Sequence, residues 1–104
     1  MPVKRYVLKV KVRYFAITRE LANLREETLD LESGTDVFHL LGLLVSKHEK
    51  LREYVFDPET GNPRLYLQFM INDNMISNLN GYATLLTEGC TFAIIPPVGG
   101  GCII

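Results

Sequence analysis

The sequence predicts a single domain of the α+β class, with a mixed sheet of four or five strands covered by one long helix. Residues 6–15 alternate between apolar and charged side chains, the period-two pattern of a half-buried strand. Residues 37–51 carry apolar side chains at the i, i+3, i+4, i+7 spacing of an amphipathic helix. Apolar, strand-like segments follow at residues 65–71 and 90–95. A chain of 104 residues has room for one modest core, which this helix and sheet would share.

The first strand is expected to have an inner and an outer face. The apolar residues expected to face the core are Leu8, Val10, Val12 and Tyr14. The residues expected on the opposite face are Lys9, Lys11 and Arg13. Residues 18–22 predict one helical turn, too short to pack as a helix. A second strand is predicted at residues 27–31, with Leu29 and Leu31 inward, before a turn at Ser33–Gly34.

The long helix is expected to begin after Thr35, a good N-cap residue, with Asp36 favourable beside the helix N-terminus. Its apolar stripe comprises Val37, Leu40, Leu41, Leu44 and His48, and Leu51 extends it. His48 is interpreted as a partly exposed residue at the end of this face, and His39 as a solvated one. Neither has a Cys, Ser or acidic residue at the spacing of a catalytic pair.

The second half of the chain alternates turns and strands. Residues 57–63 are rich in turn formers and predict a surface loop. In the next strand, the expected inward residues are Leu65, Leu67, Phe69 and Ile71, and the outward ones are Tyr66, Gln68 and Met70. Residues 72–74 reverse the chain, and residues 82–86 predict a single helical turn. The last strand, residues 90–95, ends at two prolines, and the complete order is that of the β-grasp fold.

Composition and charge exclude several classes of function. The net charge of −1 gives no general attraction to nucleic acid. The basic residues near the N-terminus alternate with apolar ones and predict the solvated face of a strand; they are Lys4, Arg5, Lys9, Lys11 and Arg13. No apolar run reaches membrane-spanning length, and no secretory signal is visible. Cys90 and Cys102 form no metal-binding pattern, so we expect no metal and a cytoplasmic protein with reduced thiols.

The C-terminal segment has the most unusual pattern in the chain. Pro96 and Pro97 end the last strand, since neither has a backbone N–H, and Gly99–Gly101 follow without side chains. Fully extended, residues 97–101 would span roughly 17 Å at about 3.4 Å per residue. Such a thin segment suits insertion into a narrow channel of another protein, although glycine-rich ends are also often plain linkers. We therefore expect a folded domain at residues 1–98 and a flexible tail at residues 99–104.

Three stretches of the chain resemble the ubiquitin-like sulfur carriers, and most closely the MoaD-like small subunit of molybdopterin synthase. Residues 12–16, followed by Arg19-Glu20-Leu21, resemble the first strand and "FA…REL" turn of that family. Residues 86–93 resemble its "L-x-D/E-G-D-x-V-A" hairpin, although Cys90 stands where an acidic residue is common. Residues 94–101 resemble its "PPVxGG" terminus.

The resemblance implies a carrier rather than a complete enzyme. A partner enzyme would use ATP to adenylate the carboxylate of Gly101, and a sulfur source would convert it to a thiocarboxylate. The residues that would enter the partner's channel are Pro97, Val98, Gly99 and Gly100. The implied partners are the adenylating enzyme and the large catalytic subunit of molybdopterin synthase, with no bound cofactor. Phe15 corresponds to an aromatic that contacts the activating enzyme, and Tyr66 and Met70 are expected beside it on the outer surface.

One departure from the family concerns the residues after the glycines. Family members usually stop at the second glycine, whereas here Cys102-Ile103-Ile104 follow Gly101. We therefore expect a peptidase to remove residues 102–104 before activation. Three other functions stay open: a ubiquitin-like modifier conjugated through its terminal glycine, a sulfur carrier for thiamine or tRNA thiolation, and a β-grasp binding module with an inert tail.

Overall fold

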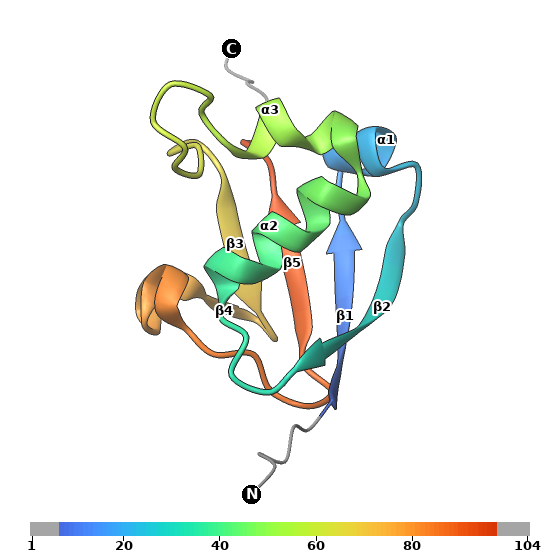
Figure 1. Cartoon of the computed structure of the whole chain (residues 1–104), viewed down its shortest axis with the longest axis vertical. Coiled ribbons are helices and arrows are strands. Elements are labelled where there is room, and N and C mark those ends of the chain that lie inside the picture. The colour runs from blue at the N-terminus through green and yellow to red at the C-terminus, as the bar shows by residue number, and fades with distance from the viewer. Residues whose placement is uncertain (1–6, 98–104) are drawn as a thin grey trace, which may run out of the picture.

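The computed structural model describes residues 7–97, which form a five-stranded sheet with helices packed on one face (Figure 1). The strands are β1 (Val7–Tyr14), β2 (Glu26–Glu32), β3 (Gln68–Ile71), β4 (Asn74–Met75) and β5 (Thr91–Ile95), and their order across the sheet is β2-β1-β5-β3-β4. β1 pairs with β5 in parallel, and the other three pairings are antiparallel. The predicted mixed sheet of the β-grasp fold is thereby confirmed. The expected tail at residues 99–104 lies outside the described residues.

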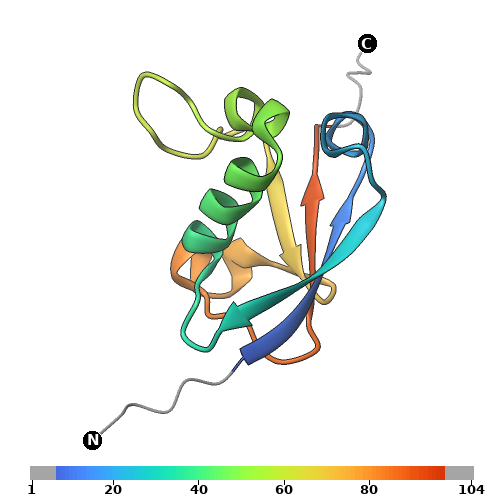
Figure 2. The ribbon, with the colours of Figure 1, turned by 45° about the vertical axis from the view of Figure 1, so that its right-hand side comes forward.

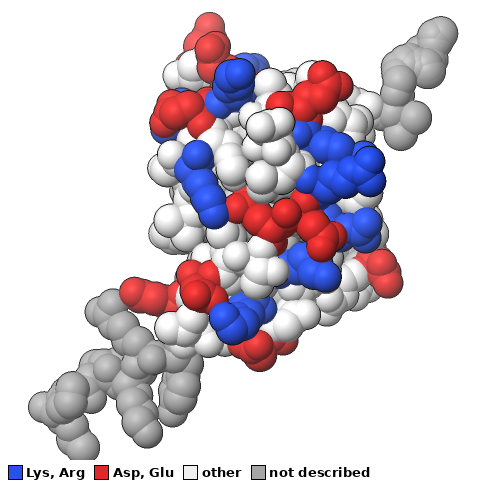
Figure 3. Space-filling model, turned by 90° about the vertical axis from the view of Figure 1, so that its right-hand side faces the viewer, with Lys and Arg blue, Asp and Glu red and all other residues white. Residues whose placement is uncertain are grey.

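The alternation predicted for β1 is confirmed. Val10, Val12 and Tyr14 are buried against the helical layer, and the intervening basic residues are exposed. Those basic side chains pair with acids of β2, since Lys9 lies 3.0 Å from Asp30 and Lys11 3.7 Å from Glu26. Figure 3 shows this side of the molecule, where acidic and basic side chains interleave. The outer surface of β1 and β2 is therefore a solvated face, as expected.

The main helix, α2 (Val37–Lys47), covers the sheet with the predicted stripe (Figure 2). Its five buried residues are Val37, Leu40, Leu41, Leu44 and Val45. The N-cap is Asp36 rather than Thr35, because the Asp36 carboxylate accepts the N–H of His39 at 2.9 Å. The helix also ends earlier than expected. At His48 the backbone leaves helical geometry, and Leu51 stays in phase only through the 3₁₀ turn η1 (Glu49–Leu51). A short helix, α3 (Arg52–Val55), follows.

The segment after β1 packs more tightly than its length suggested. It forms α1 (Ile17–Ala22), and Thr18 and Ala22 are both buried. The expectation that this turn is too short to pack is wrong, because the fixed turn before it, described below, seats α1 against η1.

The predicted third strand begins three residues late. β3 starts at Gln68, and Leu67, Phe69 and Ile71 are buried as expected. Leu65, expected inward, is 98% exposed, because the chain at this position is still in the connecting turn. The turns η2 (Ile76–Asn78) and η3 (Gly81–Ala83) lead from β4 toward β5. Gly89 then turns the chain with a φ of 78°, a conformation that favours glycine, and Cys90 is buried as a small apolar side chain.

Candidate partner-binding site

The tail leaves the domain from a central strand of the sheet. β5 lies between β1 and β3, and its last residue, Ile95, is followed by buried Pro96 and exposed Pro97. The tail is therefore anchored by a strand with hydrogen-bonded neighbours on both sides. The other tail residues assigned from the sequence, Val98 to Gly101, lie outside the described residues, as do residues 102–104.

Phe15 is held beside the end of β5 by a turn with a fixed geometry. Since Tyr14 pairs with Ile94 in parallel register, Phe15 and Ile95 follow at the same end of the sheet. The buried Thr18 hydroxyl accepts the N–H of Phe15 at 3.0 Å and donates to its carbonyl at 2.7 Å. The next residue, Ala16, has a φ of 53°, which L residues rarely adopt. The side chain of Phe15 is thus presented by an ordered backbone.

Two arginines flank the ring of Phe15. The guanidinium carbon of Arg13 lies 5.3 Å from the ring centroid and that of Arg19 lies 6.0 Å away. Arg19 also donates from Nε to the carbonyl of Tyr14 at 3.3 Å, which fixes its position on the turn. An aromatic ring between two cations is a surface suited to an apolar pocket with acidic residues at its edge.

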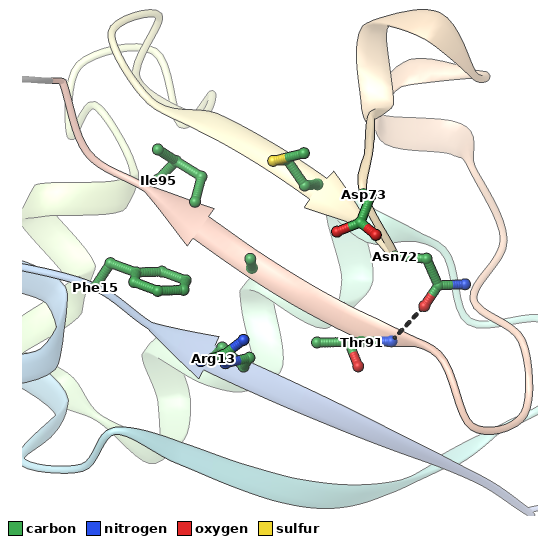
Figure 4. A pocket seen from close by; sticks show the side chains of 8 residues that line it. Arg13, Phe15, Asn72, Asp73, Thr91 and Ile95 are labelled. Atoms are coloured by element: carbon green, nitrogen blue, oxygen red, sulfur yellow. Dashed lines mark hydrogen bonds between the residues drawn. The ribbon is translucent and has the colours of Figure 1, made fainter.

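A shallow hollow on the outer face of the sheet joins Phe15 to Met70 (Figure 4). The register places Arg13, Ala93 and Met70 in one row across β1, β5 and β3. Phe15 and Ile95 also line the hollow, and Asp73 lies at its edge. The hollow is lined by apolar side chains together with the polar side chains of Arg13, Asn72, Asp73 and Thr91. It is suited to bind protein side chains.

The structure brings Phe15 and Met70 together but separates Tyr66 from them. Tyr66 precedes β3, so it does not lie on the outer face of a strand as expected. Its ring packs on that of Tyr54 with centroids 5.8 Å apart, and its hydroxyl donates to the carbonyl of Tyr54 at 3.2 Å. Ile95 and Ala93 are lining residues that the sequence reasoning missed. The apolar residues on both faces of β5 were the signal that indicated them.

A cluster of polar side chains lies on the other face of the sheet. The carboxylate of Glu27 accepts the Tyr14 hydroxyl at 2.5 Å and contacts Lys47 Nζ and His48 Nε2, each at 2.7 Å. Burial opposes ionisation of Glu27, but the bonds from Lys47, Tyr14 and His48 outweigh it and lower its pKa. Burial, together with the hydrogen bond to Glu27 and its charge, raises the pKa of Tyr14.

This cluster joins β1, β2 and the end of α2, and it lies on the opposite face from the hollow. His48 is partly exposed, as expected, but it is bonded to Glu27, 21 residues earlier in the chain. The sequence did contain a sign of this contact, since Glu27 lies on the same face of β2 as the inward residues Leu29 and Leu31. The cluster is therefore an internal connection between elements rather than a reactive site.

Residues 7–97 contain no candidate metal centre and no candidate membrane-spanning helix. No group of three or more His, Cys, Asp or Glu residues among them is arranged to hold a metal ion. No helix in the same part of the chain has the length and apolar character needed to cross a membrane.

Several known proteins are similar to this chain over most of its length. A model described as the ThiS family matches residues 12–101. The molybdopterin synthase sulfur carrier subunit of Drosophila yakuba is 38% identical over 95 residues, covering 91% of this chain and 93% of that protein. The subunit of the same name from Chlamydomonas reinhardtii is 30% identical over 94 residues, covering 90% of this chain and all of that protein. Small archaeal modifier protein 1 from Methanosarcina acetivorans has a solved structure with a TM-score of 0.80 at 32% identity, covering 92% of this chain and 99% of that one.

Proposed function

The chain belongs to the ThiS family, and on that premise we propose that it is a sulfur carrier whose reactive group is a thiocarboxylate on Gly101. The observation that carries the proposal is the family match, which runs to residue 101. Relatives at 38% and 30% identity are named sulfur carrier subunits of molybdopterin synthase. The recipient we propose for the sulfur is accordingly the molybdopterin precursor, bound by the large subunit of that synthase.

The chemistry requires partner enzymes, because the hollow and the base of the tail offer no acid–base pair among the described residues. In the proposed reaction, a carboxylate oxygen of Gly101 attacks the α-phosphorus of ATP on the adenylating enzyme, and pyrophosphate leaves. Hydrosulfide released by the sulfur donor then attacks the carbonyl carbon, AMP leaves, and loss of the S–H proton gives the thiocarboxylate. Gly99 and Gly100 contribute by having no side chains, so that the backbone enters a narrow channel.

Residues 102–104 must leave before this reaction, since Gly101 has no free carboxylate while Cys102 is attached. We propose that a peptidase cuts after Gly101. The reason is steric as well as chemical, because Ile103 and Ile104 are branched side chains where only a bare glycine would enter.

Three purified forms test this function: residues 1–104, residues 1–101, and residues 1–101 with Gly101→Ala. Each is incubated with the adenylating enzyme of the same cell, ATP and a sulfur donor, and its intact mass is measured. We expect only the second form to gain the mass of one sulfur in place of one oxygen. Equal activation of residues 1–104 would refute trimming, and failure of residues 1–101 would refute sulfur carriage.

A second candidate function is supported by the similarity to an archaeal modifier protein at 32% identity. In that case activated Gly101 would be joined to lysine side chains of other proteins. Cells that express residues 1–101 with an affinity tag distinguish the two functions. Conjugates that resist denaturation and require Gly101 would favour the modifier.

A further inference from the structure

Leu65 is exposed to an unusual degree for an apolar side chain. It is 98% exposed, the highest value among the large apolar residues that the structure describes as exposed. The residues two positions before and after it, Pro63 and Leu67, are both buried. The chain is thus anchored on both sides of Leu65, and the described residues 7–97 leave that side chain almost fully exposed.

The turn that carries Leu65 is held by several hydrogen bonds. The N–H of Arg64 donates to the carbonyl of Val55 at 2.7 Å. The Arg64 guanidinium donates twice to the carbonyl of Glu53, from Nε at 3.0 Å and from Nη2 at 2.8 Å. Tyr66 closes the turn with its bond to Tyr54. The backbone of such an ordered turn loses little conformational entropy on binding, which favours a role in recognition.

Leu65 lies at the same end of the sheet as the base of the tail. Gln68, three residues later, pairs with Ile95, the last residue of β5. Three residues span about 10 Å at most, and paired strands lie about 5.5 Å apart, so Leu65 is within about 16 Å of Ile95. Figure 1 shows the segment before β3 at the same end of the sheet as the end of β5. Since β5 lies between β1 and β3, Leu65 and Phe15 lie on the two sides of the tail's base.

Because the tail is short, an enzyme that binds its end must also come near the surface around Leu65. Residues 97–101 span roughly 17 Å when extended, so an enzyme that acts on Gly101 must come close to Pro97 and to the residues around it. We propose that Leu65 is a second contact for the adenylating enzyme, filling an apolar pocket beside the entrance that receives the tail. This inference rests on the proposed function. Arg64 and Asp57, both partly exposed and paired at 3.9 Å, would give this pocket a polar edge.

The experiment compares Leu65→Ala with Leu85→Ala, both made in the form of residues 1–101. Leu85 is a matched control because it is 57% exposed and bridges to Asp36 beside the N-terminus of α2, away from the tail. Binding to the adenylating enzyme is measured by titration without ATP, and KM and kcat are measured from pyrophosphate release. We expect Leu65→Ala to raise Kd and KM about tenfold with kcat retained, and Leu85→Ala to change neither.

Three results would overturn the inference without refuting the proposed function. One is an unchanged Kd for Leu65→Ala with an enzyme that activates the wild type normally, which leaves the proposed function intact. Another is an equal rise in Kd for both variants, which would indicate a general effect on the fold. The third is a wild-type dimer that Leu65→Ala dissociates in sedimentation equilibrium, which would identify a second copy of the chain as the occupant. Failure of the wild type itself to be activated would refute the proposed function, and this inference with it.

Discussion

Replacing Glu27 should destabilise the protein far more than replacing its neighbour Glu26. Glu27 is 11% exposed and accepts bonds from Tyr14, Lys47 and His48, whereas Glu26 is 49% exposed and lies 3.7 Å from Lys11 and 3.8 Å from Arg13. Glu27→Ala leaves the Tyr14 hydroxyl buried without its acceptor, a loss of about 1–3 kcal/mol. Loss of the contact with the largely buried His48 adds to this, while the exposed Lys47 ammonium turns to water at little loss.

We therefore expect Glu27→Ala to lower the free energy of unfolding by about 3 kcal/mol at pH 7. Glu27→Gln should lower the free energy of unfolding by only about 1–2 kcal/mol, because the amide oxygen still accepts the hydrogen bond from Tyr14. The matched control Glu26→Gln should change stability by less than about 0.5 kcal/mol, as exposed ion pairs do. Urea denaturation followed by circular dichroism measures all four proteins.

The pH dependence of these differences gives a second test. The pKa of Glu27 is lowered in the folded state, so its ionised form stabilises the fold above the ordinary glutamate pKa of about 4.3. That contribution is lost as pH falls through the lower folded-state pKa. Wild type and Glu27→Gln should thus converge in stability once the pH has fallen below this lowered folded-state pKa. A Glu27→Ala variant as stable as Glu26→Gln at pH 7, or a difference between wild type and Glu27→Gln that persists in acid, would refute the reasoning.

Three further predictions concern the core, the turn and the hollow. Leu41→Ala should lower the free energy of unfolding by about 2–5 kcal/mol in urea denaturation, because Leu41 is fully buried. A smaller loss would show that α2 does not pack on the core as described. Thr18→Val should lower the free energy of unfolding by about 1–3 kcal/mol, because it leaves the N–H of Phe15 without its acceptor. An unchanged free energy of unfolding in the same assay would mean that the turn does not need this bond. Phe15→Ala should weaken binding of the adenylating enzyme about tenfold in a titration, whereas Phe38→Ala, at an exposed phenylalanine of α2, should not. Equal affinities for these two variants would exclude the hollow as the binding surface.

The sequence alone determined the parts of this protein that depend on local periodicity. The inward residues of β1 and α2 follow from periods of two and 3.6, because a side chain's face is set by the geometry of its own element. The composition of residues 99–104 predicts a tail, and this prediction lies outside the described residues. The family resemblance added an expected role for Phe15, and the structure places this residue beside the end of β5 without testing that role.

Only the tertiary structure decided where elements begin and end, and which residues meet. Periodicity alone predicted that the third strand begins at Leu65 and that the helix extends to Leu51. Both predicted elements are too long, because a side chain can stay in phase after the backbone has changed conformation. Met70 and Ile95 come from β3 and β5, and Phe15 directly follows β1. Their meeting depends on strand order, which hydrogen bonds between distant segments establish. Glu27 and His48 meet for the same reason. Contacts between elements are fixed by packing of the whole chain, and no local pattern contains that information.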